Sequence, residues 1–138
     1  MADNRYVLDT SALICYLEDE DGADIVDELI SQAEDQIIEL TVVFASFMEI
    51  YYITWQEQGI SIAEEQDGLL RELPLNRLES SPELGRLAGG FKAQYRLSFA
   101  DAWIAAAAEM LDAVLVHKDP EFEAIESEIQ VLKLPYKG

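Results

Sequence analysis

Cysteine and histidine are nearly absent from this sequence: Cys15 and His117 are the only ones among 138 residues. A single cysteine excludes an internal disulfide and fits a reducing compartment. One cysteine and one histidine also cannot supply the Cys/His ligands of a zinc site. No apolar run reaches the roughly 18 residues that a membrane-spanning helix needs, and residues 1–5 do not resemble a secretory signal. We therefore expect a cytoplasmic protein without a membrane segment.

Positive charge is also scarce, because 9 Lys and Arg face 28 Asp and Glu and give a net charge of −19. Such a charge repels nucleic acid at long range and attracts cations and basic partners. A long acidic run between Glu18 and Asp35 contains no base. This run is typical of a solvated helix face. A docking surface for a basic partner segment is the alternative.

The sequence contains no internal repeat, low-complexity segment or linker, so we expect one domain over residues 1–138. Half of the residues are hydrophobic, which is enough for a sizeable core. Short apolar runs predict strands at 6–8, 36–40, 75–78, 113–116 and 129–132. Helical patterns alternate with these runs. The alternation predicts an α/β fold with a central parallel sheet and helices on both faces.

Polar side chains stand where the first predicted strand ends and a helix begins. Asp9 follows the apolar run 6–8, and Thr10 and Ser11 come directly after it. Ligands of open α/β sheets bind at this edge, because the loops there leave a crevice. A helix N-cap role for one of these three side chains explains the same pattern.

Two further acids are expected at the same edge of the sheet. Asp119 follows the strand at 113–116, and Asp101 opens the helix that leads into that strand. Parallel strands end at one edge, and a connecting helix runs antiparallel to the strand it feeds. We therefore expect Asp9, Asp101 and Asp119 to converge. Asp101 and Asp119 also fit helix-capping patterns, so each alone has a purely structural explanation.

A long apolar helix is predicted from Val42 to Gln58, with Thr41 as its cap. Glu49 lies in its middle, among aromatic and aliphatic residues. A carboxylate in such surroundings needs a partner or a cation, because burial of an unpaired charge is costly. The alternative is that Glu49 points to solvent. The aromatic content of this helix exceeds what a small core needs and predicts a homodimer interface.

Converging carboxylates repel one another, by roughly 3 kcal/mol for a pair about 5 Å apart at an effective dielectric near 20. A hard cation that prefers oxygen ligands, Mg²⁺ or Mn²⁺, would relieve this repulsion. Such an ion polarises a phosphate and lowers the pKa of a bound water. The sequence has no covalent nucleophile with a paired base and no Gly-rich phosphate loop. Water is therefore the expected attacking group.

Four parts of the chain carry a resemblance to a known family: residues 7–13, Glu49, residues 95–106 and residues 117–122. In order and spacing they resemble PIN domains and, more narrowly, the VapC-type toxins of bacterial and archaeal toxin–antitoxin pairs. The resemblance covers essentially the whole chain. It implies a three-layer α/β/α fold with a parallel sheet and Mg²⁺- or Mn²⁺-dependent endoribonuclease activity. It also implies a homodimer that a cognate antitoxin inhibits.

The resemblance implies a catalytic acidic quartet that binds the metal: Asp9, Glu49, Asp101 and Asp119. Asp9 and Asp101 would be the main ligands, and Thr10 or Ser11 would orient Asp9 or a bound water.

His117 stands where the family often has a hydroxyl residue before its last acid. This departure puts in doubt a hydrogen bond that supports Asp119, although not the metal site itself. The strong negative charge is unusual for an enzyme that cuts RNA. Contact with RNA would therefore be confined to a small basic lip, for which the candidates are Arg86, Lys92 and Arg96.

Two other function classes fit the same residues. In a non-catalytic protein-binding module of PIN fold, the acidic pocket would receive a basic residue of a partner, and the strong negative charge favours this. Another metal-dependent phosphotransfer domain would also place acids at the sheet edge. The absence of a second acid directly after Asp9, and of a phospho-accepting Asp after a middle strand, argues against that class.

Overall fold

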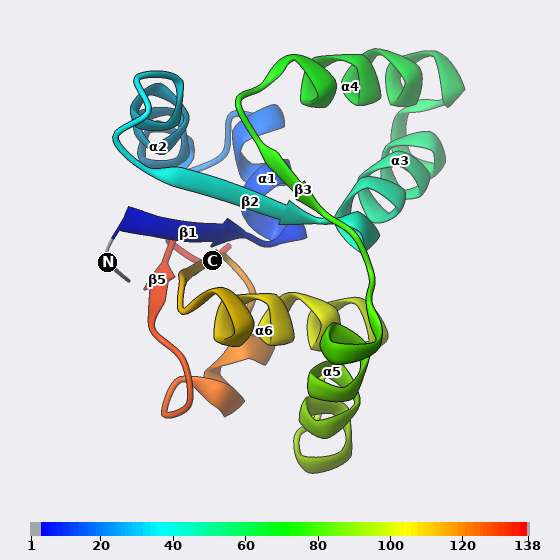
Figure 1. Cartoon of the computed structure of the whole chain (residues 1–138). Coiled ribbons are helices and arrows are strands. Elements are labelled where there is room, and N and C mark those ends of the chain that lie inside the picture. Colours follow the sequence, from blue (N-terminus) through cyan, green and yellow to red (C-terminus); the bar gives the residue numbers. More distant parts are fainter. Residues whose placement is uncertain (1–3, 138) are drawn as a thin grey trace.

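The computed structural model describes residues 4–137 and contains a five-stranded sheet (Figure 1). Every strand pair is parallel, and the spatial order is β3-β2-β1-β4-β5. The strands are β1 (Arg5–Leu8), β2 (Glu39–Val43), β3 (Asn76–Leu78), β4 (Val114–His117) and β5 (Val131–Lys133). The predicted α/β fold with a central parallel sheet is confirmed.

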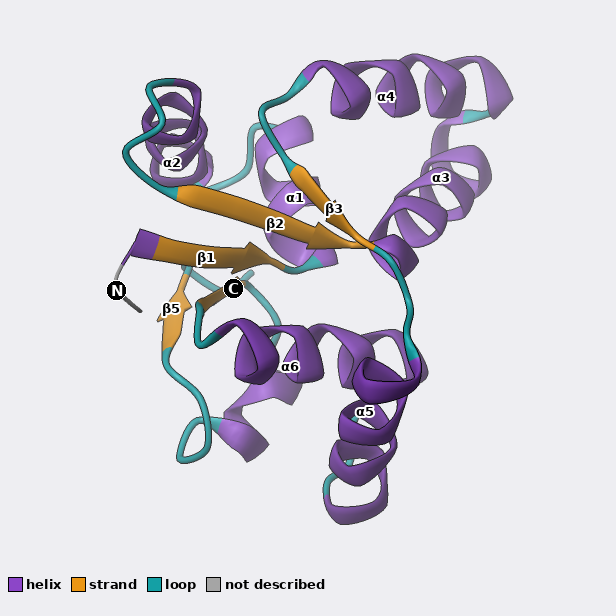
Figure 2. Cartoon of the chain, viewed as in Figure 1, coloured by secondary structure: helices purple, strands orange, loops and turns teal. Residues whose placement is uncertain are grey.

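Helices cover both faces of the sheet (Figure 2). They are α1 (Thr10–Leu17), α2 (Ala23–Glu34), α3 (Phe44–Gln58), α4 (Ile60–Glu72), α5 (Pro82–Gln94), α6 (Phe99–Leu111) and the 3₁₀ helix η2 (Pro120–Ile125). One core cluster packs α5, α6 and η2 against one face, and a second packs α1, α2, α3 and α4 against the other. No helix among residues 4–137 combines the length and apolar character that crossing a bilayer requires.

The second strand and the helix after it lie later in the chain than predicted. The strand was expected at 36–40 with Thr41 as a helix cap, but Thr41 lies inside β2 and is buried. It pairs with Val7 of β1 on one side and Asn76 of β3 on the other. Because β2 has a neighbour on each side, its β-branched residues 41–43 remain in the sheet. Helix α3 therefore begins at Phe44.

The last strand is also displaced, from the predicted 129–132 to Val131–Lys133. Ile129 packs in the core just before β5 instead of pairing in the sheet. Its apolar character therefore indicates burial and not a strand. A short apolar run alone does not distinguish a strand from another buried segment.

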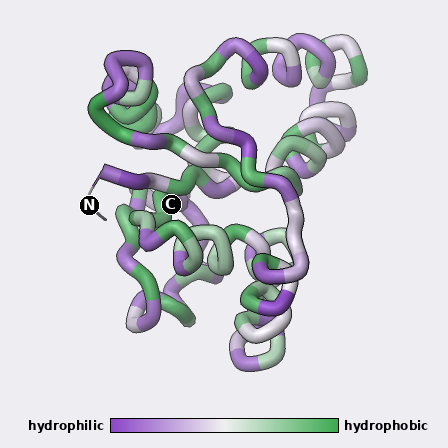
Figure 3. Tube along the Cα trace, viewed as in Figure 1, coloured by the Kyte–Doolittle hydropathy of each residue, from purple (hydrophilic) through white to green (hydrophobic). Residues whose placement is uncertain are grey.

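Helix α6 lies close against the sheet because its inward side chains are small. Ala105, Ala106 and Ala107 are fully buried, together with Ile104. Figure 3 shows the apolar character of this helix. Since α6 runs back along the sheet before β4 begins, its first turn lies at the edge where β1 and β4 end. This packing brings the start of α6 to the loops that follow β1 and β4.

Candidate functional site

Asp9 is fixed at the end of β1 by hydrogen bonds to its backbone and to its side chain. Its N–H donates to the Val116 carbonyl of β4 over 3.1 Å. Its Oδ1 accepts the Ala12 N–H at 2.8 Å, so Asp9 is the N-cap of α1. The residue is only 1% exposed. Asp9 therefore has the capping role that the sequence pattern allowed. Its carboxylate is at the same time buried at the edge of the sheet.

Ser11 connects Asp9 to the loop that follows β4. Its Oγ lies 2.8 and 2.7 Å from the two carboxylate oxygens of Asp9 and donates to them. The same oxygen accepts the Lys118 N–H at 2.8 Å. Of the two hydroxyls that were candidates to orient Asp9, Ser11 is the one that contacts it.

Thr10 contacts a different carboxylate, that of Glu49. The Thr10 Oγ1 donates to Glu49 Oε1 over 2.5 Å and lies 3.0 Å from Ser46 Oγ. Glu49 comes from the second turn of α3 and is half-buried. It therefore faces the start of α1, and this contact places it beside the residue that follows Asp9.

Asp101 lies in the first turn of α6 and is 7% exposed. The helix is capped by Ser98, whose Oγ accepts the Asp101 N–H at 3.2 Å. The Glu121 carboxylate, from η2, accepts a hydrogen bond from the Asp101 carboxyl when Asp101 is protonated. It also accepts the Ser98 N–H at 2.6 Å. Glu121 thus joins the start of α6 to the segment that carries Asp119.

Glu121 was not among the predicted site residues. Only its position in the sequence could have indicated it. Glu121 follows Asp119 and Pro120 in the turn that opens η2. The Asp119 Oδ1 accepts the Glu121 N–H at 2.9 Å, so the two acids are held in one turn.

His117 supports the backbone of Asp119. Its Nδ1 accepts the Asp119 N–H at 3.1 Å, and the ring is fully buried against Phe122. Burial lowers the pKa of the His117 imidazole, which favours the neutral ring that this contact requires. The residue in place of the family's hydroxyl therefore supplies a hydrogen bond to Asp119 from a ring nitrogen.

The three aspartates lie within electrostatic reach of one another. Burial raises the pKa of Asp9 to about 7, and the negative charge of Asp119 adds to the effect. Burial, the hydrogen bond to Glu121, and the charges of Asp119 and Asp9 raise the pKa of Asp101 to about 9. The low dielectric of the site thus disfavours the ionised form of both groups.

The donor chemistry of this cluster fits a divalent cation. Its donors are carboxylate and hydroxyl oxygens, which suit Mg²⁺ or Mn²⁺. In the range 4–137, no three Asp, Glu, His or Cys side chains are already arranged as ligands around one point. Ion binding therefore requires side-chain rotation toward a common centre, and the repulsion among the carboxylates gives an ion the energetic reason to bind.

The structure separates the three candidates for the basic lip. The Lys92 Nζ donates to the Leu97 carbonyl at 3.0 Å, beside the first turn of α6. The hydrogen bond to Asp101 and also the Lys92 charge lower the pKa of Glu121, which places Lys92 near the acids. Arg86 lines a different hollow, together with acids of other elements, and Arg96 is exposed in the turn between α5 and α6.

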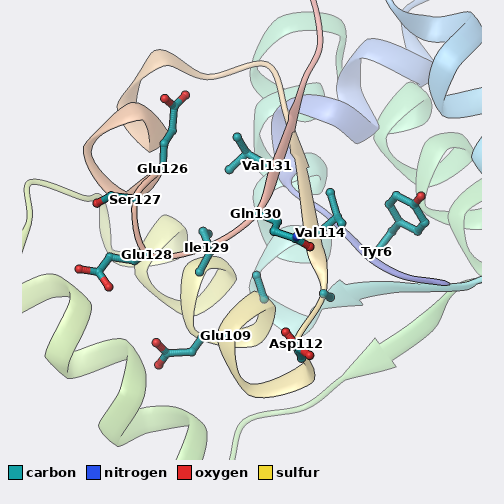
Figure 4. A pocket seen from close by; sticks show the side chains of 12 residues that line it. Tyr6, Glu109, Asp112, Val114, Glu126, Ser127, Glu128, Ile129, Gln130 and Val131 are labelled. Atoms are coloured by element: carbon teal, nitrogen blue, oxygen red, sulfur yellow. The ribbon is translucent and has the colours of Figure 1, made fainter. Parts of the chain in front are cut away.

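A hollow of about 820 Å³ lies away from this edge, where β1 and β4 begin (Figure 4). Its acids, among them Glu109, Asp112 and Glu128, surround an open mouth. The chemistry of the buried aspartates, and not the size of the hollow, identifies the candidate site.

The raised pKa values predict that stability without divalent metal falls as pH rises. In the folded state Asp9 binds more protons than in the unfolded state between about pH 4 and pH 7, and Asp101 does so between about pH 4 and pH 9. Their stabilising effect is complete below about pH 4 and is lost as pH rises through the folded pKa values. For Asp9 the difference is roughly 4 kcal/mol, at 1.36 kcal/mol per pKa unit.

Thermal melts at several pH values, with EDTA and with Mg²⁺, measure this effect. We expect Mg²⁺ to raise the melting temperature more at pH 8 than at pH 5. An equal rise in melting temperature with Mg²⁺ at both pH values would contradict the assignment of a cation site. The absence of any rise, in the wild type and in Asp9→Asn alike, would contradict it as well.

Comparison with known proteins adds the family. Residues 6–128 match the family model of the PIN domain. VapBC2 from Rickettsia felis, solved bound to a promoter DNA fragment, is similar in structure, with a TM-score of 0.75 and 14% identity over 95% of this chain and 99% of that one. DNA-bound VapBC from Salmonella typhimurium has a TM-score of 0.73 and 17% identity, over 94% and 97%.

VapC20 from Mycobacterium tuberculosis, a toxin that cleaves the sarcin–ricin loop, has a TM-score of 0.67 and 12% identity, over 86% of this chain and 93% of that one. At these identities the structures show a shared fold. No curated protein matches the sequence significantly. The family match spans more than half of the chain and extends past Asp119, and the chain therefore belongs to the PIN domain family.

Proposed function

We propose that this protein is a Mg²⁺- or Mn²⁺-dependent endoribonuclease and the toxin of a toxin–antitoxin pair. One observation carries the proposal: Asp9 and Asp101 are buried carboxylates within electrostatic reach of Asp119. None of the ion pairs found among residues 4–137 includes any of the three. A cation is the charge that this site lacks.

In this proposal Asp9 and Asp101 are the main metal ligands, and Glu49 and Asp119 complete the acidic quartet. When bound, the metal lowers the pKa of a water and polarises the phosphodiester. Ser11 orients the Asp9 carboxylate. Membership of the PIN family and the fold shared with a sarcin–ricin loop cleaving toxin support RNA as the substrate.

A non-catalytic protein-binding module of PIN fold is the second candidate. The net charge of −19 favours it, and so does the lack of a ready three-ligand arrangement within residues 4–137. In that case a basic side chain of a partner would take the position of the metal between the carboxylates. Such a module would bind a partner through Asp9 and Asp101 without hydrolysing RNA.

We also propose that the protein forms a homodimer and binds an antitoxin through apolar side chains of α3 and α4. Met48 is 64% exposed, Trp55 49% and Ile60 50%. Exposure of several large apolar side chains on neighbouring helices is typical of interaction surfaces. The similar structures from Rickettsia felis and Salmonella typhimurium are VapBC complexes, which supports a protein partner for this chain.

Asp9→Asn and Asp101→Asn test the catalytic proposal, because each keeps the side-chain volume and removes a ligand charge. We expect each to lower the rate of RNA cleavage by at least about 100-fold in Mg²⁺ or Mn²⁺. Asp24→Asn, at an exposed acid of α2, is the matched control. Cleavage of a labelled RNA by purified protein is the measurement, and EDTA should abolish it. Unchanged cleavage by Asp9→Asn would overturn the proposed site.

Sedimentation tests the dimer. We expect the wild type to sediment as a dimer at micromolar concentration, and Trp55→Glu to shift it to a monomer, because a charge replaces an exposed aromatic ring of α3. Gln56→Glu, the next position of the same helix, adds the same charge and should leave the mass unchanged. A monomeric wild type would refute a homodimer.

A further inference from the structure

A smaller hollow of about 320 Å³ opens beside Asp119, between α1, the loop after β4 and residues 136–137. Ser11 and Asp119 line one side of it, so it is continuous with the acidic site. Ile14 and Pro120 provide apolar wall, and the ring of Tyr136 faces the same space. Its volume is at the lower end of the range for ligand pockets, which suits one small planar group.

We propose that this hollow binds one nucleotide of a single-stranded RNA, next to the phosphate that is cleaved. The base stacks on Tyr136, and Lys137 contacts a backbone phosphate. The inference rests on the proposed function, because it names how the substrate of that same site is held.

Two ammonium groups line the hollow. Lys118 and Lys137 share a single carboxylate, that of Glu20, with Nζ to oxygen distances of 3.4 and 2.9 Å. Together with Asp119, the charged groups of the lining balance one another. In a chain with a net charge of −19, this balance lowers the repulsion of a phosphate that approaches Asp119.

The two lysines have different roles. The Lys118 side chain is 4% exposed, and its Nζ also donates to the Asp21 carbonyl at 2.7 Å, so it is fixed inside the protein. The Lys137 side chain is 76% exposed and pairs with Glu20, and the charges of Glu57 and Glu18 also act on it. Lys137 is therefore the one that is free to reach a phosphate in the hollow.

The ring of Tyr136 is held in place by the same residue that supports Asp119. The His117 and Tyr136 ring centroids are 6.2 Å apart with an interplanar angle of 34°, within the range of aromatic packing. His117 also accepts the Asp119 N–H. One buried ring thus fixes both the proposed stacking platform and a proposed metal ligand. Aromatic rings beside positive charge are the usual means of binding single-stranded nucleic acid.

Lys92 lies near Glu121 and the start of α6, whereas Lys137 lines the hollow beside Asp119. A strand that contacts both lysines would run along the acidic site. Two such contacts explain how so acidic a protein could hold RNA with few bases.

Fluorescence anisotropy with a labelled single-stranded RNA hexanucleotide of mixed sequence tests the inference. The titrations use the Asp9→Asn background with Mg²⁺, so that binding is read without turnover, and gels check that the RNA stays intact. Tyr136→Ala should weaken binding by about 10-fold, within the range measured for loss of one stacked base. Tyr136→Phe keeps the ring and should bind like the parent.

Lys137→Gln should weaken binding and lower its salt dependence, because one phosphate contact is lost. Lys133→Gln is the matched control, since Lys133 pairs with Glu126 outside the hollow. If Tyr136→Ala does not fold, the comparison of Lys137→Gln with Lys133→Gln decides, because Lys137 is exposed. The subsite would be overturned if Tyr136→Ala bound the RNA as tightly as Tyr136→Phe, or if Lys137→Gln bound it as tightly as Lys133→Gln. It would also be overturned if the parent did not bind the RNA. If the subsite were overturned in this way but Asp9→Asn still abolished RNA cleavage, the proposed function would remain and only the subsite would be wrong.

Discussion

The burial of carboxylates at one edge of a parallel sheet, to which their mutual repulsion adds, is the constraint that decides the chemistry of this structure. The fold brings Asp9, Asp101 and Asp119 together, because β1 and β4 end at the same edge and α6 begins there. The protein interior raises the pKa of Asp9 and Asp101 and makes their ionised forms costly. This arrangement is unfavourable for folding alone, and in the proposed function a divalent cation offsets its cost.

The residues around the acids act mainly by fixing their positions. Ser11 hydrogen-bonds both Asp9 and the loop after β4, and so connects the ends of two strands. His117 holds the Asp119 backbone, and Glu121 joins that segment to α6. Each contact links elements that are distant in sequence. In the proposed function, these contacts would hold the carboxylates close to the position of the ion.

The sequence was sufficient to predict the edge but not its contacts. Asp9, Asp101 and Asp119 could be placed there because strand ends and helix starts follow from alternation alone. Thr41 was misplaced, since a β-branched residue after a strand reads equally as a helix cap. Glu121 and Lys118 were missed because their contacts are tertiary: Glu121 meets Ser98, and Lys118 pairs with Glu20. The members of each pair are far apart in the sequence, so local residue spacing does not predict their contact.

Broadening of amide resonances by Mn²⁺ in ¹⁵N-labelled protein tests the central claim most directly, because a paramagnetic ion reports where it binds. The account predicts that substoichiometric Mn²⁺ first broadens the amides of residues 9–11, 99–101 and 119–121, and that Asp9→Asn weakens this effect. Broadening that begins instead at the exposed acids of α2, or around the hollow lined by Glu109 and Glu128, would contradict it.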